Sequence, residues 1–149
     1  MGLLTDLGMG PVGLDSSIFI YFLEENPELL PVVEPVFTAI AGGTITAVTS
    51  SLTLLEVLVQ PLRRALPALA EEYEQILTQS SGLRLVPLDL RLLRAAAHLR
   101  AATQLKTPDA VHIASALMTG CTAFLTNDRR IPEVPGLRIL RAQSYLPLS

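Results

Sequence analysis

The sequence contains no tryptophan and a single cysteine, Cys121. One cysteine excludes an internal disulfide and suits a reducing compartment, and the missing tryptophan argues against a ligand site built on a large aromatic platform. Charged residues are also scarce, at 17% of 149 residues, whereas half of the residues are hydrophobic. Such a chain can bury a sizeable core, so we expect one ordered domain over residues 1–149, because two domains would each have too small a core.

Basic residues are outnumbered: 11 lysines and arginines stand against 14 acids, for a formal net charge of −3. Bulk charge therefore offers no attraction to polyanions, and nucleic-acid binding would need local arginines or a bound metal ion. Residues 1–13 contain Asp6 and no basic segment typical of a secretory signal. The longest uncharged window, residues 35–55, is broken by two glycines and seven serines or threonines, so we expect a cytoplasmic protein without a membrane span.

Short apolar runs alternate with helical patterns along the whole chain. The runs are the stretch before Asp15, residues 44–50, residues 83–89, the segment from Cys121 to Thr126-Asn127-Asp128, and residues 136–140. This alternation predicts an α/β fold, a three-layer α/β/α sandwich with a central, mostly parallel sheet of about five strands.

Four carboxylates occupy comparable places in this pattern. They are Asp15 and Asp128 at the ends of the first and fourth strands, Glu56 in the helix after the second strand, and Asp109 in the first turn of a later helix. Because ligands of open parallel sheets bind beyond the carboxyl ends of the strands, all four side chains can project toward one edge. Carboxylates gathered in this way repel one another unless their pKa values rise or cations bind. Oxygen-only donor sets favour Mg²⁺ or Mn²⁺, and such ions assist phosphodiester hydrolysis.

Each of these acids also has a purely structural interpretation. Asp109 gains ~0.3–1 kcal/mol from the helix dipole, and Asp15 suits a turn before Ser16-Ser17, a pair able to cap the next helix. Asp128 suits an Asx turn. Glu56 is the hardest to explain structurally, because leucines and valines surround it and a buried unpaired carboxylate is unfavourable.

Four segments carry a resemblance to a known family. In chain order they are "GLDSSIFIYFLE", "SSLTLLEVL", "KTPDAVHIASAL" and "FLTNDRRI". Their order and separation resemble those of PIN-domain nucleases, particularly the VapC-type toxins of toxin–antitoxin pairs. The similarity spans residues 13–131 and continues through "GLRIL", whereas residues 1–12 lie outside it.

The resemblance implies a PIN-like sandwich and a metal-dependent endoribonuclease. It implies that Asp15, Asp109 and Asp128 hold Mg²⁺ or Mn²⁺, with Glu56 acting through water, and that a metal-activated water hydrolyses RNA phosphodiesters. It further implies a homodimer and a cognate antitoxin protein that blocks the site.

Polar residues next to the four acids are candidates for supporting roles. Ser17 and Thr126 match family positions that commonly carry a hydroxyl, which either bonds a carboxylate or phosphate or caps a helix or turn. Lys106, Arg129 and Arg130 flank the acids and are candidates for contacts with RNA phosphates, with solvated surface charge as the alternative.

The two histidines are interpreted differently from the acids. His112 shares a helix face with Asp109, but its apolar neighbours favour a packed histidine over a site residue, and His98 is expected at the surface. The sequence has no H-E-x-x-H motif for zinc and no phosphate-binding loop. Ser17 stands where a haloacid-dehalogenase-type phosphatase needs a second aspartate. The remaining alternatives are a catalytically silent PIN module that binds RNA or protein, and a PIN nuclease that processes RNA without being a toxin.

Overall fold

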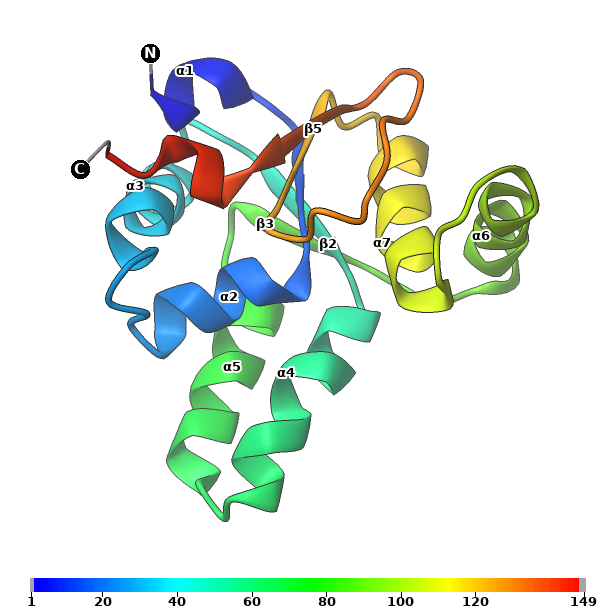
Figure 1. The fold of residues 1–149 in the computed structure, drawn as a ribbon. Coiled ribbons are helices and arrows are strands. Elements are labelled where there is room, and N and C mark those ends of the chain that lie inside the picture. The colour runs from blue at the N-terminus through cyan, green and yellow to red at the C-terminus, as the bar shows by residue number, and fades with distance from the viewer. Residues whose placement is uncertain (1, 148–149) are drawn as a thin grey trace.

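The computed structural model describes residues 2–147 and contains a five-stranded sheet in the order β3-β2-β1-β4-β5 (Figure 1). The strands are β1 (Val12–Leu14), β2 (Ala47–Ser50), β3 (Leu83–Val86), β4 (Ala123–Thr126) and β5 (Arg138–Arg141). Every neighbouring pair is parallel. The predicted α/β fold with a parallel central sheet is therefore confirmed.

Helices cover both faces of this sheet. They are α1 (Leu3–Leu7), α2 (Ser16–Leu23), α3 (Leu30–Ala41), α4 (Leu52–Arg63), α5 (Pro67–Gln79), α6 (Leu90–Ala102), α7 (Thr107–Met118) and the short 3₁₀ helix η1 (Ala142–Tyr145). The α4–α5 hairpin extends beyond the sheet, and α6 and α7 lie together on the opposite side from α3 (Figure 1). Across residues 2–147, no helix is long and apolar enough to cross a bilayer.

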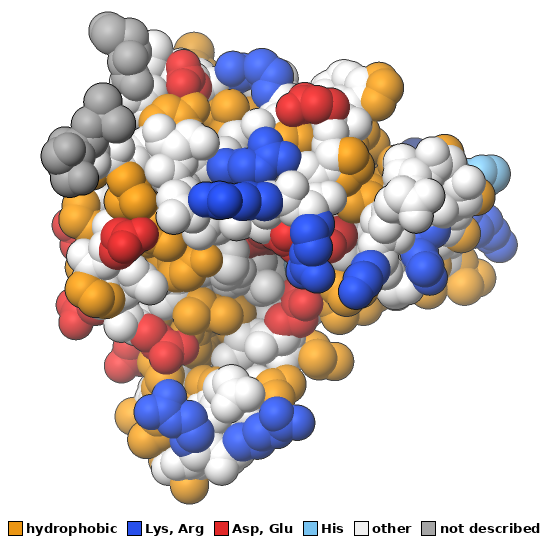
Figure 2. All heavy atoms as spheres, viewed as in Figure 1, with side chains coloured by type: hydrophobic (Ala, Val, Ile, Leu, Met, Phe, Trp, Pro, Cys, Tyr) orange, Lys and Arg blue, Asp and Glu red, His pale blue; other side chains and the backbone are white. Residues whose placement is uncertain are grey.

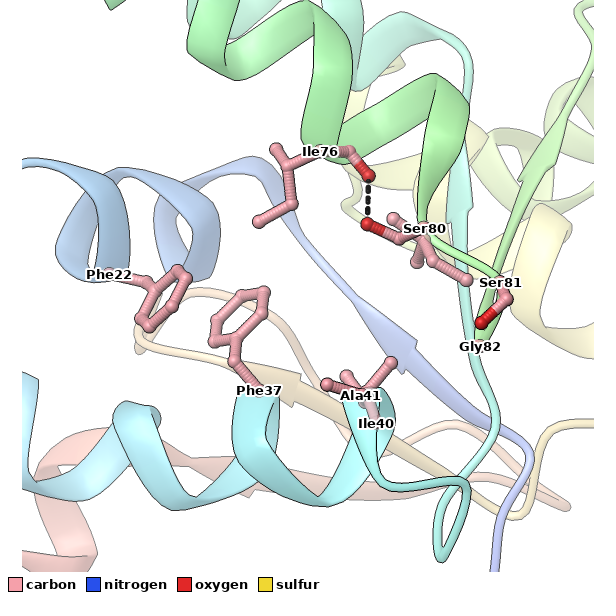
Figure 3. Close-up of a pocket in the computed structure, with 9 residues that line it drawn as sticks. Phe22, Phe37, Ile40, Ala41, Ile76, Ser80, Ser81 and Gly82 are labelled. Carbon is pink, nitrogen blue, oxygen red and sulfur yellow. Dashed lines mark hydrogen bonds between the residues drawn. The ribbon is translucent and has the colours of Figure 1, made fainter.

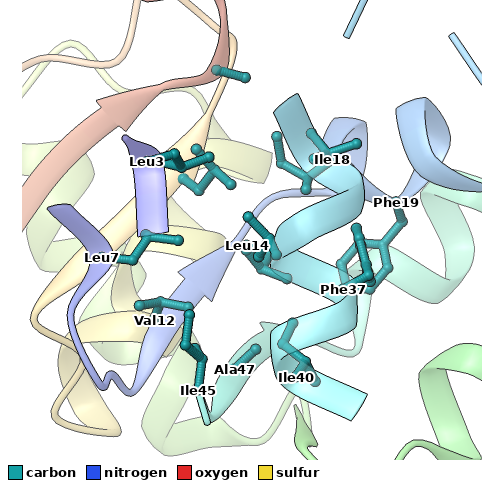
Figure 4. Close-up of a cluster of buried hydrophobic side chains, with 14 of the residues drawn as sticks. Leu3, Leu7, Val12, Leu14, Ile18, Phe19, Phe37, Ile40, Ile45 and Ala47 are labelled. Atoms are coloured by element: carbon teal, nitrogen blue, oxygen red, sulfur yellow. The ribbon is translucent and has the colours of Figure 1, made fainter. Parts of the chain in front are cut away.

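The hydrophobic core is divided by the sheet into two clusters, because successive strand side chains point to opposite faces. Ala47 and Leu125 belong to the cluster that α1, α2, α3 and α5 complete (Figure 4). Val48 and Phe124, one residue away on the same strands, belong to the cluster under α6 and α7. Burial on both faces explains why β1 and β4 are almost wholly apolar, whereas the edge strands β3 and β5 carry the exposed Arg84 and Arg138.

The order of the strands creates a switch point beside β1. The chain builds β2 and β3 on one side of β1 and then returns to place β4 and β5 on the other side. Leu14 at the end of β1 is level with Leu125 near the end of β4. Residues that follow these two strands therefore meet at one edge, where connections leave in opposite directions and parallel sheets bind ligands.

The central strand β1 contains a glycine that allows α7 to approach the sheet closely. A Cβ atom added at Gly13 would lie 2.7 Å from Cδ1 of Phe124 and 2.9 Å from Cβ of Ala116. Both distances are shorter than carbon atoms tolerate, so only glycine fits between β4 and α7 here. Since Asp109 and His112 are in α7, this close approach sets how far they lie from the strand ends.

We predict that Gly13→Ala destabilises the fold by about 1–3 kcal/mol, because the added methyl group overfills a packed core. The measurement is urea unfolding, in which the midpoint should fall at an unchanged slope. Gly2→Ala is the matched control, since a Cβ there meets nothing within 4 Å and the backbone has a φ of −84°. Equal midpoints for the two variants would show that α7 can shift without loss of stability.

Candidate active site

A pocket of about 220 Å³ lies at the carboxyl edge of β1 and β4 and gathers the four predicted acids. Its lining consists of Asp15, Ser16, Ser17, Tyr21, Glu56, Asp109, His112, Asn127 and Asp128. On this face, acidic side chains sit in a recess with lysine and arginine side chains around it (Figure 2). Segments far apart in the chain thus contribute one carboxylate each to the same hollow.

Asp15 is the most constrained of the four carboxylates. It is 8% exposed and caps α2 by accepting a hydrogen bond from the amide of Ser17 at 3.0 Å. The Ser17 hydroxyl donates to the same oxygen at 2.5 Å, and the Thr126 hydroxyl donates to the other oxygen. The expectation that Ser16-Ser17 would cap the helix is corrected: Asp15 is the cap, and the serines form its first turn.

Burial raises the pKa of Asp15 above its ordinary value, although the hydrogen bonds from Ser17 and Thr126 and the charge of His112 oppose the shift. The two hydroxyls therefore orient a carboxylate whose ionised form the surroundings do not fully stabilise. A cation at this position would remove that imbalance.

Asp109 lies in the first turn of α7, after the cap residue Lys106. Burial, followed by the charge of Asp128, raises its pKa, and the charge of Asp15 adds to the effect. The three aspartates are therefore within electrostatic reach of one another. Within residues 2–147 no hydrogen bond to the Asp109 carboxylate is present, which leaves its oxygens available to a ligand.

Glu56 has a histidine partner on another helix. Its Oε1 atom lies 2.6 Å from Nε2 of His112, which is 4% exposed. Burial alone would raise the pKa of Glu56, but the hydrogen bond and charge of His112, together with Ser16, outweigh it, and the pKa is lowered. The interpretation of His112 as only a packed histidine was incomplete, since it is buried and also holds a site carboxylate. Its spacing from Asp109 hinted at this face of the helix, but nothing local indicates a partner 56 residues away.

Asp128 is held by an arginine fork. Arg130 donates from Nε to Oδ1 at 3.0 Å and from Nη2 to Oδ2 at 2.9 Å, and its amide also donates to Oδ1. Hydrogen bonding to Arg130 lowers the pKa of Asp128. Lys106 and Arg129 do not line this pocket. Of the three flanking basic residues, Arg130 is the one that touches a site carboxylate.

The donor set suits a hard divalent cation, because the four carboxylates offer only oxygen ligands. Within residues 2–147, however, no three acidic, histidine or cysteine side chains are close enough to enclose an ion as they stand. Two of the carboxylates already have basic partners, because Glu56 is bonded to His112 and Asp128 to Arg130. An ion bound by all four carboxylates must compete with these two partners.

A second hollow, of about 310 Å³, has a different character. It lies between α2, α3, α5 and the start of β3, and Phe22 and Phe37 stack at its edge with ring centroids 4.1 Å apart (Figure 3). The Ser80 hydroxyl in its wall already donates to the carbonyl of Ile76. No titratable side chain lines this hollow, in contrast to the acidic pocket.

Comparison with known proteins gives one family match. The PIN domain family matches residues 12–137, which is most of the chain. Similar solved structures include VapBC from Salmonella typhimurium bound to DNA, with a TM-score of 0.68, 20% identity, and coverage of 88% of this chain and 97% of that one. VapBC2 from Rickettsia felis, bound to a promoter fragment, has a TM-score of 0.67 at 16% identity, covering 87% and 97%.

A third similar structure is VapC20 from Mycobacterium tuberculosis, a toxin that cleaves the sarcin–ricin loop. Its TM-score is 0.65 at 15% identity, with coverage of 80% of this chain and 91% of that one. No curated protein gives a significant match to the sequence. At these identities the likeness concerns the fold.

We predict that Asp109→Asn stabilises the metal-free protein at neutral pH. The pKa of Asp109 is higher in the folded than in the unfolded protein. The contribution of Asp109 to stability is therefore fully present below the pKa of the unfolded chain, near 3.9, and is lost as the pH rises through the pKa of the folded protein. The variant lacks this loss, so its unfolding free energy should exceed that of the parent at pH 7 in EDTA. The excess should shrink toward pH 4. Asp89→Asn, the same change at the N-cap of α6, is the control. A less stable Asp109→Asn protein at pH 7 would mean that the helix dipole dominates at this position.

We further predict that His112→Leu raises the pKa of Glu56, because the hydrogen bond and charge are lost while burial persists. The Glu56 carboxyl carbon can be followed by NMR titration of the metal-free protein. His98→Leu removes the other, exposed histidine and should leave that titration unchanged. An unshifted Glu56 in the His112→Leu protein would contradict the assigned pairing.

Proposed function

The chain belongs to the PIN domain family, and we propose that it is a metal-dependent endoribonuclease, the toxin of a VapBC-type toxin–antitoxin pair. The observation that carries the proposal is the convergence of Asp15, Glu56, Asp109 and Asp128 on one pocket. A structural role for each acid would not require four segments to meet at the switch point of the sheet. Similar structures of VapBC complexes and of an RNA-cleaving VapC toxin support the more specific part of the proposal.

In the proposed site, Asp15, Asp109 and Asp128 hold Mg²⁺ or Mn²⁺ directly, and Glu56 contributes through water. When bound, such an ion lowers the pKa of a water molecule and offsets negative charge on the phosphate. Asp15 is fixed by Ser17 and Thr126, so its oxygens are oriented before any ligand arrives.

Glu56 serves as the acceptor for a water proton in this proposal. The His112 hydrogen bond and the lowered pKa keep its carboxylate ionised and directed into the pocket. A phosphodiester is the proposed target, because its hydrolysis needs the positive charge that an ion supplies to this acidic site, and the similarity to a toxin that cleaves the sarcin–ricin loop supports RNA as the substrate. Lys106, Arg129 and Arg130 are proposed to contact flanking phosphates, and a cognate antitoxin is the proposed protein partner.

One observation favours a second candidate, a catalytically silent PIN module. Asp128 and Glu56 are each paired with a basic side chain, which neutralises part of the site without an ion. In a silent module these pairs would persist in the presence of Mn²⁺, and the protein would bind RNA or protein without cutting it.

The test is cleavage of total cellular RNA by the purified chain with Mn²⁺, compared with EDTA and with Asp109→Asn. Because loss of even a supporting group near a metal often lowers activity 10–100-fold, loss of a ligand should reduce cleavage by about 100-fold or more. Discrete fragments that disappear in both comparisons would support the nuclease. Asp89→Asn should cleave as the parent does.

Thermal melting separates the two candidates if no RNA is cut. Mn²⁺ that raises the melting temperature of the parent, but not of Asp109→Asn, indicates an ion bound at this site. Equal cleavage by the parent and by Asp109→Asn would contradict the proposed site. So would a parent protein whose melting temperature does not change when Mn²⁺ is added.

A further inference from the structure

A third hollow, of about 270 Å³, adjoins the acidic pocket and has the opposite charge. Its lining is Asn127, Arg129, Arg141, Gln143 and Ser144, and we call it the arginine pocket. Asn127 lines both hollows, so the two share a wall. We propose that the arginine pocket binds a backbone phosphate of the RNA that flanks the scissile bond. This inference rests on the proposed nuclease function and adds Arg141 to the residues that recognise substrate.

The composition of the arginine pocket matches a phosphate group. Two of the five lining residues are arginines, three are neutral and polar, and none is acidic or apolar. The planar guanidinium presents several N–H donors that bind phosphate oxygens in pairs, and amide and hydroxyl side chains supply further phosphate contacts. A cationic ligand would meet two arginines and no carboxylate in this lining.

Arg141 is held in place before any ligand arrives. It is the last residue of β5, is half-buried, and donates from Nη2 to the carbonyl of Ile131 at 2.6 Å. One bond occupies only part of the guanidinium, which carries five N–H donors. Because the side chain is already anchored, binding a phosphate immobilises less of it than it would a free surface arginine.

The shared wall between the two pockets is also fixed. Asn127 accepts a hydrogen bond from the amide of Gln143 at 2.9 Å and donates to the Tyr21 hydroxyl at 3.3 Å. Tyr21 itself lines the acidic pocket. The segment after β4 is thereby tied to the segment after β5, which sets the spacing between the carboxylates and the arginines.

The arginines of this region differ in what they already bind. Arg130 is engaged by Asp128, whereas within residues 2–147 neither Arg129 nor Arg141 forms an ion pair. The charge of Arg141 nevertheless contributes to lowering the pKa of Asp128, so it lies within electrostatic reach of the acidic site. A chain with a net charge of −3 and an acidic pocket repels RNA unless such local charges offset it.

The experiment measures binding of a fluorescein-labelled single-stranded oligoribonucleotide by anisotropy, in EDTA so that it is not cut, over a series of salt concentrations. Arg141→Gln and Arg129→Gln should each weaken binding severalfold. Each should also reduce the slope of log K against log salt by at most about 0.7, the value for one phosphate contact on a single strand. Arg63→Gln is the matched control, because it removes the same charge at the far end of α4 (Figure 1).

Three outcomes would overturn the proposal. The first is wild-type affinity and slope for Arg141→Gln, and the second is an equal loss for Arg63→Gln, which indicates bulk charge alone. The third is weakened binding with an unchanged slope and a lowered melting temperature, which indicates a structural role through Ile131. Arg141→Lys keeps the charge without the fork, so it should retain most of the slope while losing part of the affinity.

Failure of this inference is distinguishable from failure of the proposed function. If the parent protein cleaves RNA and Arg141→Gln binds RNA with unchanged affinity, only the proposed phosphate binding by the arginine pocket is overturned. If Arg141→Gln reduces the salt slope of RNA binding but the parent protein never cleaves RNA, only the proposed nuclease activity is overturned. If both stand, Arg141→Gln should raise KM for RNA cleavage with little change in kcat.

Discussion

The crowding of four carboxylates into one pocket is the constraint on which the rest of this structure depends. Asp15, Glu56, Asp109 and Asp128 line one small pocket, and the charges of Asp15 and Asp128 help to raise the pKa of Asp109. The chain relieves the repulsion differently at each acid. Hydroxyl groups bond Asp15, a histidine bonds Glu56 and an arginine fork bonds Asp128. Among the residues that the structure describes, 2–147, Asp109 has no such partner, so a cation would gain most at this position.

The fold imposes this crowding through its topology and its core. A strand order that switches sides at β1 brings the ends of β1 and β4 together, and Gly13 lets α7 approach them. Two hydrophobic clusters, one on each face of the sheet, hold the helices that carry the acids. Burial of this apolar surface offsets the unfavourable electrostatics of the pocket, as is usual where a site conflicts with stability.

Basic side chains lie around the acidic pocket, although the net charge of the chain is negative. A negative chain offers no general attraction to RNA, yet basic side chains border the acidic recess (Figure 2). They fall into two groups with different roles. Arg130 neutralises a site carboxylate, whereas Arg129 and Arg141 line a neighbouring hollow that is free of acids. Acidic and basic hollows side by side suit a ligand that has several phosphates in a row.

The sequence by itself determined the α/β architecture and the positions of the acids relative to the strands and helices. Alternating apolar runs predicted the parallel sheet, and Asp15 and Asp128 were placed at strand ends because local hydrophobic patterns mark where strands stop. These features follow from the pattern of apolar residues over short stretches, which can be read from one sequence alone.

Only the tertiary structure decided how the acids are paired and what surrounds them. The hydrogen bond between Glu56 in α4 and His112 in α7 joins residues that are 56 positions apart in the chain. Arg141 lies near the site although it belongs to the last strand. Asp15 caps α2 through the Ser17 amide, and only the fold brings Thr126, at the end of the neighbouring strand β4, to its second oxygen. Such contacts follow from which strands become neighbours and which rotamers fit between them. Local sequence patterns cannot encode these choices, because both partners of each contact are set by the packing of the whole chain.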